Sequence, residues 1–303
     1  MKKTYITVDI ETIVSGISKN KNSLAGVYLG AMFIAHELRK RNLKATFFIS
    51  LSSKQKSIDN TEYLDLIKCL VLSLKSFENI KIASHLHAFE LPMDFECDSD
   101  DFGAYNQEQQ VSMLRFSKDF FTDLDCDVDA FRPGGFRRNE FYYSALEEAG
   151  FKYSSTMSKN DKPNINLITG KLSNTNQVNC QGKVLEYPVT TVELMSIKKR
   201  VEIQNLSPDF LSIESVKPHL DNLEYININF HSFSIYLNRL VRENHTGLFW
   251  NNIRFLAIDK MLDFMANLFG IHTFKSDTIV KNSFLDWVEF LEEKKYETYF
   301  IGE

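Results

Sequence analysis

The sequence predicts an α/β protein built on a parallel sheet or barrel, as one large domain. Strand-like and helical runs alternate from residue 4 to residue 231, an order that produces parallel strands joined by helices. In addition, the side chains best suited to chemistry lie where strand-like runs end, at the edge where parallel sheets bind their ligands. The 303 residues and 44% hydrophobic content are sufficient for a sizeable core.

The first strand is predicted at residues 4–11, where apolar and polar side chains alternate. Alternate side chains of a strand point to the same face, so Asp9 and Glu11 should lie together at its carboxyl end. Apolar residues at helical spacing then predict a helix over residues 27–41. Residues 45–49 predict the second strand.

A helical run at residues 63–77 leads into a third predicted strand, residues 79–83, which ends in Ser84-His85-Leu86-His87. If the backbone stays extended there, His85 and His87 share one face. The carboxylate pair and the imidazole pair should therefore meet at the same edge of the sheet.

The same alternation continues in the second half of the chain. Strands are predicted at 129–132, 183–189 and 225–231, and helices around Met113 and at 144–149. Arg132 and His231 end two of these strands. The polar run 160–182 is expected to be either a long surface loop beside the site or a disordered excursion.

Helices are predicted after the last strand. An apolar stripe at helical spacing ends at Gly270 and is formed by Phe255, Ile258, Leu262, Met265 and Phe269. Ser283 and Asp286 are predicted to cap a last helix, which carries Trp287.

Composition excludes several classes of function. A net charge of −5 and a pI near 5.9 predict no basic surface for nucleic acid. The four cysteines form no Cys-x-x-Cys pair, which argues against a zinc knuckle or a disulfide scaffold. Neither a signal peptide nor a run of ~18 apolar residues is present, so we expect no membrane span and a cytoplasmic location.

The two spaced pairs predict a metal centre. Two histidines and one carboxylate are a common ligand set for a catalytic Zn²⁺, and the other carboxylate can serve as a base. Each pair alone is more often a solvated or structural feature, and a single His231 is more often a core histidine. Their common position at strand ends favours chemistry. Arg132 either ties down a carboxylate or holds developing charge.

Several segments, taken in order, resemble the polysaccharide deacetylase family, which is carbohydrate esterase family four and contains the NodB-like domain. The resemblance covers residues 4 to about 235. It is carried by Thr7-Val8-Asp9-Ile10-Glu11, Ala45-Thr46-Phe47-Phe48-Ile49, Ile82-Ala83-Ser84-His85, Phe131-Arg132-Pro133-Gly134-Gly135, Ala145-Leu146-Glu147-Glu148-Ala149-Gly150-Phe151, Leu185-Glu186-Tyr187-Pro188-Val189 and Ile228-Asn229-Phe230-His231-Ser232.

The resemblance implies a distorted (β/α)7-type barrel, which we place at residues 1–240. The helical spacing after the last strand predicts that residues 241–303 form a helical extension packed on the same domain. The resemblance also implies hydrolytic removal of an acyl group from an amide or ester, with one divalent cation as cofactor. The leading hypothesis for the substrate is an N-acetylated sugar or glycan. Zn²⁺ is the first choice, and Co²⁺, Ni²⁺ or Mn²⁺ are alternatives. By position, Asp9 would be the base, oriented by Arg132, and His231 the acid.

Glu11 and His85 would be metal ligands in this scheme, and the sequence departs from the family pattern around them. The second histidine usually follows the first by four residues, where this chain has Phe89, so His87 is assigned as the third ligand on geometric grounds. No aspartate to support the acid and the arginine is evident at Tyr153-Ser154-Ser155. Two alternatives stay open: a hydrolase of a small non-sugar amide, and a catalytically silent carbohydrate-binding protein.

Overall fold

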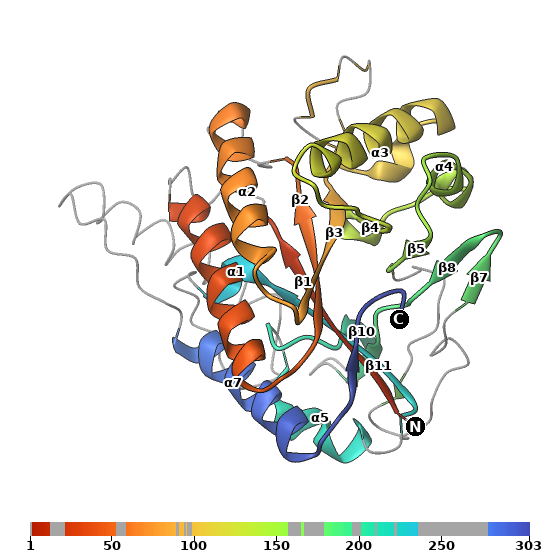
Figure 1. Cartoon of the computed structure of the whole chain (residues 1–303). Coiled ribbons are helices and arrows are strands. Elements are labelled where there is room, and N and C mark those ends of the chain that lie inside the picture. Colours follow the sequence, from red (N-terminus) through yellow and green to blue (C-terminus); the bar gives the residue numbers. More distant parts are fainter. Residues whose placement is uncertain are drawn as a thin grey trace, which may run out of the picture.

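The computed structural model describes most of the chain. The described residues are 2–12, 22–52, 59–88, 91–93, 95, 99–156, 165–166, 179–195, 201–209, 211–220, 223–235 and 278–303. Within them, one curled sheet is surrounded by helices (Figure 1). Phe89 and the stripe from Phe255 to Phe269 lie outside the described residues.

Seven parallel strands of the described chain form the main sheet, in the order β11-β1-β2-β3-β4-β5-β8. Their bounds are β1 Lys3–Ile10, β2 Ala45–Ser50, β3 Ile80–Leu86, β4 Ala130–Pro133, β5 Tyr153–Ser154, β8 Val184–Glu186 and β11 Tyr225–His231. Strand β7 (Asn179–Gln181) is antiparallel to β8, and β12 (Thr298–Tyr299) pairs with the start of β1.

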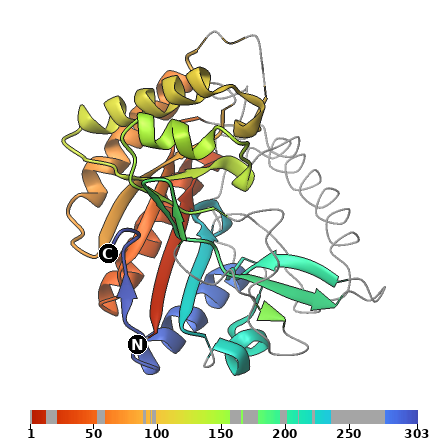
Figure 2. The same cartoon turned by 90° about the vertical axis from the view of Figure 1, so that its right-hand side faces the viewer.

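Backbone hydrogen bonds bring the two ends of this sheet together. After β8 the chain turns towards β11, where the Thr190 amide donates to the Asn227 carbonyl at 3.0 Å and the Asn229 amide donates to the Leu206 carbonyl at 3.1 Å. The predicted distorted (β/α)7-type barrel is therefore confirmed. A second sheet, in the order β10-β9-β6, extends to one side (Figure 2); its strands are β6 Ile165–Asn166, β9 Thr191–Met195 and β10 Val201–Asn205.

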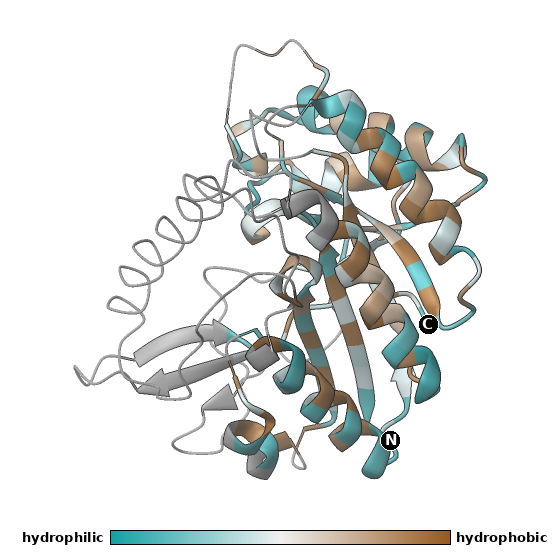
Figure 3. Cartoon of the chain, turned by 90° about the vertical axis from the view of Figure 1, so that its left-hand side faces the viewer, coloured by the Kyte–Doolittle hydropathy of each residue, from teal (hydrophilic) through white to brown (hydrophobic). Residues whose placement is uncertain are grey.

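Helices cover the outer face of the sheet, with their hydrophobic sides turned inward (Figure 3). The α-helices are α1 Asn22–Lys40, α2 Asn60–Leu74, α3 Gln107–Thr122, α4 Tyr142–Glu148, α5 Ile213–Leu220 and α7 Thr278–Glu293, and the 3₁₀ turns are η1 Phe102–Ala104, η2 Gly134–Phe136 and η3 Ser232–Ile235. Asp59 caps α2, and Asn106 with Gln109 forms a capping box for α3.

Strand alternation divides the buried side chains into two clusters. On β1, Ile6, Val8 and Ile10 face the helices and belong to the main core. Tyr5 faces the inside of the curled sheet, where a smaller cluster lies. Because the inner face becomes polar towards the carboxyl end of β1, with buried Thr7 and Asp9, this alternation places the polar groups at one edge.

Three details differ from the sequence prediction. Helix α7 starts at Thr278, so Ser283 lies inside it and does not cap it. The expected loop 160–182 contains the strands β6 and β7. The C-terminal tail contains the short strand β12, whereas only helices were predicted after residue 231. Two residues are too few to show the period of a strand in the sequence.

Candidate metal and catalytic centre

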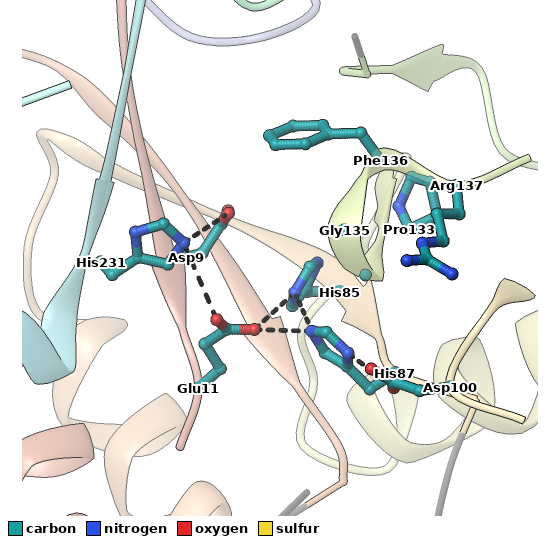
Figure 4. Close-up of a pocket in the computed structure, with 11 residues that line it drawn as sticks. Asp9, Glu11, His85, His87, Asp100, Pro133, Gly135, Phe136, Arg137 and His231 are labelled. Atoms are coloured by element: carbon teal, nitrogen blue, oxygen red, sulfur yellow. Dashed lines mark hydrogen bonds and ion pairs between the residues drawn. The ribbon is translucent and has the colours of Figure 1, made fainter. Parts of the chain in front are cut away.

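Five of the six residues predicted for the site lie together at the carboxyl edge of the sheet (Figure 4), and the sixth, Arg132, forms an ion pair with Asp9 there. Asp9 of β1 is in register with His231 of β11, and His85 of β3 is in register with Arg132 of β4. A cavity of about 320 Å³ opens there, lined by Asp9, Glu11, His85, His87, Asp100, Pro133, Gly134, Gly135, Phe136, Arg137 and His231.

Glu11, His85 and His87 form a compact buried triangle of potential metal ligands. Glu11 Oε2 lies 2.9 Å from His85 Nε2 and 2.7 Å from His87 Nε2, and the two Nε2 atoms are 3.1 Å apart. Ligand atoms around a tetrahedral Zn²⁺ are separated by about 3.3 Å, given Zn–N distances of about 2.05 Å. The triangle therefore needs to widen by only a few tenths of an ångström to hold such an ion.

The hydrogen-bond partners of the two Nδ1 atoms determine which nitrogen of each imidazole carries the proton. His85 Nδ1 faces the carbonyl oxygen of Arg132 at 2.9 Å, and His87 Nδ1 faces a carboxylate oxygen of Asp100 at 2.8 Å. Both partners only accept hydrogen bonds, so each Nδ1 carries a proton and each neutral imidazole presents its Nε2 lone pair to the centre.

Three acceptor atoms, Glu11 Oε2 and the Nε2 atoms of His85 and His87, thus point at one another inside the protein. Their lone pairs repel one another unless a cation, either a proton or a metal ion, lies between them. Burial lowers the pKa of His85, although Glu11 and Asp9 oppose this effect, so protonation of this imidazole is unfavourable at neutral pH. The donor set of two imidazoles and one carboxylate suits a divalent ion of the Zn²⁺ type. The residues present fit the predicted cofactor.

Arg132 is completely buried and its five N–H groups have five acceptors nearby. It donates to Asp9 Oδ1 at 2.6 Å and to Asn229 Oδ1 at 2.8 Å. Its remaining bonds go to the Thr7 hydroxyl at 2.8 Å and to the carbonyl and hydroxyl oxygens of Ser155, at 2.9 and 2.7 Å. This network fixes the Asp9 carboxylate at the edge of the cavity.

Asp9 remains a carboxylate in this environment. Burial by itself raises the pKa of Asp9, but the charge of Arg132, with contributions from His85 and His231, lowers it below its ordinary value. The second oxygen, Oδ2, lies 3.8 Å from His231 Nε2. A group with these properties can accept a proton from a water molecule in the cavity.

His231 is held by a buried carboxylate on its other side. His231 Nδ1 lies 2.6 Å from Asp209 Oδ2, which also accepts the His231 backbone amide at 3.2 Å. Burial lowers the pKa of His231, but Asp209, Glu11 and Asp9 outweigh burial and raise it. The imidazolium form is therefore favoured, with Nε2 directed at the cavity between Asp9 and Glu11, each 3.8 Å away.

Asp209 and Asp100, which contact His231 and His87, were not predicted from the sequence. One aspartate near Ser155 was expected to serve both the arginine and the acid. In the structure these tasks are divided, because Ser155 contacts Arg132 and Asp209 contacts His231. Both aspartates lie in irregular segments, where no periodicity marks a residue.

The turn after β4 forms one wall of the cavity. A side chain in place of Gly134 would meet the His87 ring at 2.4 Å, so the close approach requires glycine. Gly135 and Phe136 both have φ of 58°, a left-handed conformation that is costly for a bulky residue such as Phe136. Gly134 thus allows the turn to pack directly on the His87 ring.

No family model and no curated protein matches the chain. Among solved structures, a polysaccharide deacetylase from Mycobacterium smegmatis is similar over 90% of this chain and 92% of its own, with 14% identity and a TM-score of 0.49. A family 4 carbohydrate esterase from Streptomyces lividans, in complex with acetate, is similar over 89% and 90%, with 12% identity and a TM-score of 0.41.

A 4-alpha-glucanotransferase from Thermococcus litoralis is similar over 88% of this chain but 37% of its own, with 13% identity and a TM-score of 0.46. Polysaccharide deacetylases and family 4 esterases are thus among the solved structures that this chain resembles. At these scores the likeness assigns no role to any residue.

Proposed function

We propose that this protein is a metal-dependent hydrolase that removes an N-acetyl group from a sugar or polysaccharide precursor. The observation that carries the proposal is the buried triangle of Glu11, His85 and His87. It shares one cavity with the Asp9 carboxylate and the His231 imidazole. The acetylated sugar as substrate rests on the motif resemblance.

The chain's own residues divide the work as follows. Glu11, His85 and His87 would hold the ion, which when bound polarises the acyl carbonyl and makes a nearby water more acidic. Asp9, kept ionised by Arg132, takes a proton from the attacking water. His231, kept protonated by Asp209, donates a proton to the leaving nitrogen as the carbon–nitrogen bond breaks.

Zn²⁺ is our proposal for the ion, because two imidazoles and one carboxylate are typical of catalytic zinc sites. Co²⁺, Ni²⁺ and Mn²⁺ remain alternatives. No helix in the described part of the chain is long and apolar enough to cross a membrane. We propose a cytoplasmic location from the sequence, with an acetylated glycan precursor as the partner.

The first test measures bound metal per chain, by elemental analysis of protein purified without a histidine tag. We expect stoichiometric metal in the wild type and its loss in His85→Ala and His87→Ala. Wild-type protein that stays free of metal after supplementation would refute the proposal and favour a silent carbohydrate-binding protein.

The second test measures acetate release from N-acetylated sugars and oligosaccharides. Asp9→Asn should keep its metal and lose acetate release, because an amide cannot accept the proton. Full activity in Asp9→Asn would exclude Asp9 as the base. Metal-dependent release of acid from simple amides but from no sugar would favour the small-amide hydrolase.

A further inference from the structure

Helix α7 contacts the loop that carries Asp209 at two points, although the two are far apart in the sequence. Ser283 donates its hydroxyl to the carbonyl of Pro208 at 3.0 Å, and the Trp287 indole donates to the carbonyl of Leu211 at 2.9 Å. These carbonyls lie on either side of Asp209. The Trp287 side chain is 1% exposed, so its hydrogen bond is shielded from water.

The same helix also packs against the strand that carries His231. The Phe284 ring stacks on Phe230 with centroids 5.0 Å apart and an angle of 13° between the rings. Phe230 immediately precedes His231. One stretch of α7 therefore contacts both the strand that carries His231 and the loop that carries Asp209. Phe284 contacts the strand, and Ser283 and Trp287 contact the loop.

Asp209 depends on its backbone for its position. It lies in the irregular Asp209 segment, residues 207–209 and Leu211, between β10 and α5, where no strand or helix hydrogen bond holds it and its amide donates to the Ser207 hydroxyl at 3.2 Å. Its Oδ2 is bonded to His231 and to the Ser207 hydroxyl, whereas its buried Oδ1 has no hydrogen-bond partner within the described residues. A buried carboxylate that is only partly satisfied stays in place only if the surrounding structure prevents it from moving.

We propose that α7 is a positioning element of the candidate acid, in which Ser283 and Trp287 fix the Asp209 segment, through Pro208 and Leu211, so that Asp209 holds the His231 imidazole. The inference rests on the proposed role of His231 in catalysis. The two hydrogen bonds act on backbone carbonyls, so they set the place of the segment without touching substrate. Ser283 and Trp287 are therefore positioning residues.

The direct test is proton NMR of the full chain with ¹⁵N-labelled histidine. A hydrogen bond of 2.6 Å between an imidazole N–H and a carboxylate gives a proton signal at low field, which can be assigned by its loss in His231→Gln and its displacement in Asp209→Asn. We expect the signal to shift or broaden in Ser283→Ala and in Trp287→Phe, which retains an aromatic ring. Ser73→Ala is the matched control, since the Ser73 hydroxyl also joins a helix to another element, at Tyr28, away from the site.

Kinetics provide the second readout. A general acid contributes ~10²–10⁴-fold, and misplacement by about 1 Å costs up to ~10²-fold, so we expect kcat for an amide substrate to fall about tenfold in either variant. Hydrolysis of an activated aryl acetate, whose leaving group needs no proton, should change less than about twofold.

The outcomes separate the inference from the proposed function. An unchanged signal in both Ser283→Ala and Trp287→Phe overturns the inference, even if the protein is a deacetylase. A signal that moves in both variants and stays in Ser73→Ala supports it, even if no sugar substrate is found. Equal losses on the amide and the activated ester would show a general disturbance of the site and would also overturn the assigned positioning role.

Discussion

Arg132 offers the sharpest test of the structure, through the substitution Arg132→Lys. The guanidinium satisfies Asp9, Asn229, Thr7 and Ser155 through five hydrogen bonds in a fully buried position. A lysine ammonium keeps the positive charge but has three donors on a flexible stem. At least two buried acceptors must therefore lose their bond.

Each buried polar group left without a partner costs about 1–3 kcal/mol, so Arg132→Lys should lower the free energy of unfolding by about 2–6 kcal/mol. This is a large share of the ~5–15 kcal/mol that stabilises a typical protein. Urea unfolding followed by circular dichroism measures the change.

Arg137→Lys provides the matched control. Arg137 is a half-exposed arginine on the cavity rim, with an ion pair of 3.1 Å to Asp101. Its replacement should change the free energy of unfolding by no more than about 0.5 kcal/mol. Equal, small effects in the two variants would refute the network assigned to Arg132.

Three further predictions concern metal affinity, pH and metal removal. Asp100→Asn should weaken metal binding about 10–100-fold in a chelator competition, because Asp100 orients His87, while Asp101→Asn should leave it unchanged; equal affinities would exclude this role. Burial raises the pKa of Glu186, which accepts from the Thr156 amide, so the wild type loses stability as pH rises from the unfolded value of about 4.5 through the raised folded value. Glu186→Gln should thus gain stability relative to the wild type as the pH rises above about 4.5 in urea unfolding, and a difference that stays constant with pH would contradict this. Finally, Zn²⁺ at about 100 times its dissociation constant should stabilise the wild type by about 2.7 kcal/mol, a gain that chelation removes and that His85→Ala lacks; the same gain in the variant would place the metal elsewhere.

The sequence alone determined which side chains face the site from each strand. A period of two puts Asp9 and Glu11 on one face, and it does the same for His85 and His87. Parallel strands joined by helices then bring their carboxyl ends to one edge. Both inferences depend on local periodicity and chain direction, which a single sequence contains, and in the structure the predicted residues do lie together.

The tertiary structure alone decided what supports these residues. Asp209 is 22 residues before His231, with α5 between them, and it meets the imidazole only because the Asp209 segment lies against β11. Asp100 likewise reaches His87 from an irregular segment. The contacts of α7 with Pro208 and Leu211 join residues more than seventy positions apart. In an irregular segment no sequence period indicates which way a side chain points. The energy of a hydrogen bond depends on distances that only the folded chain sets.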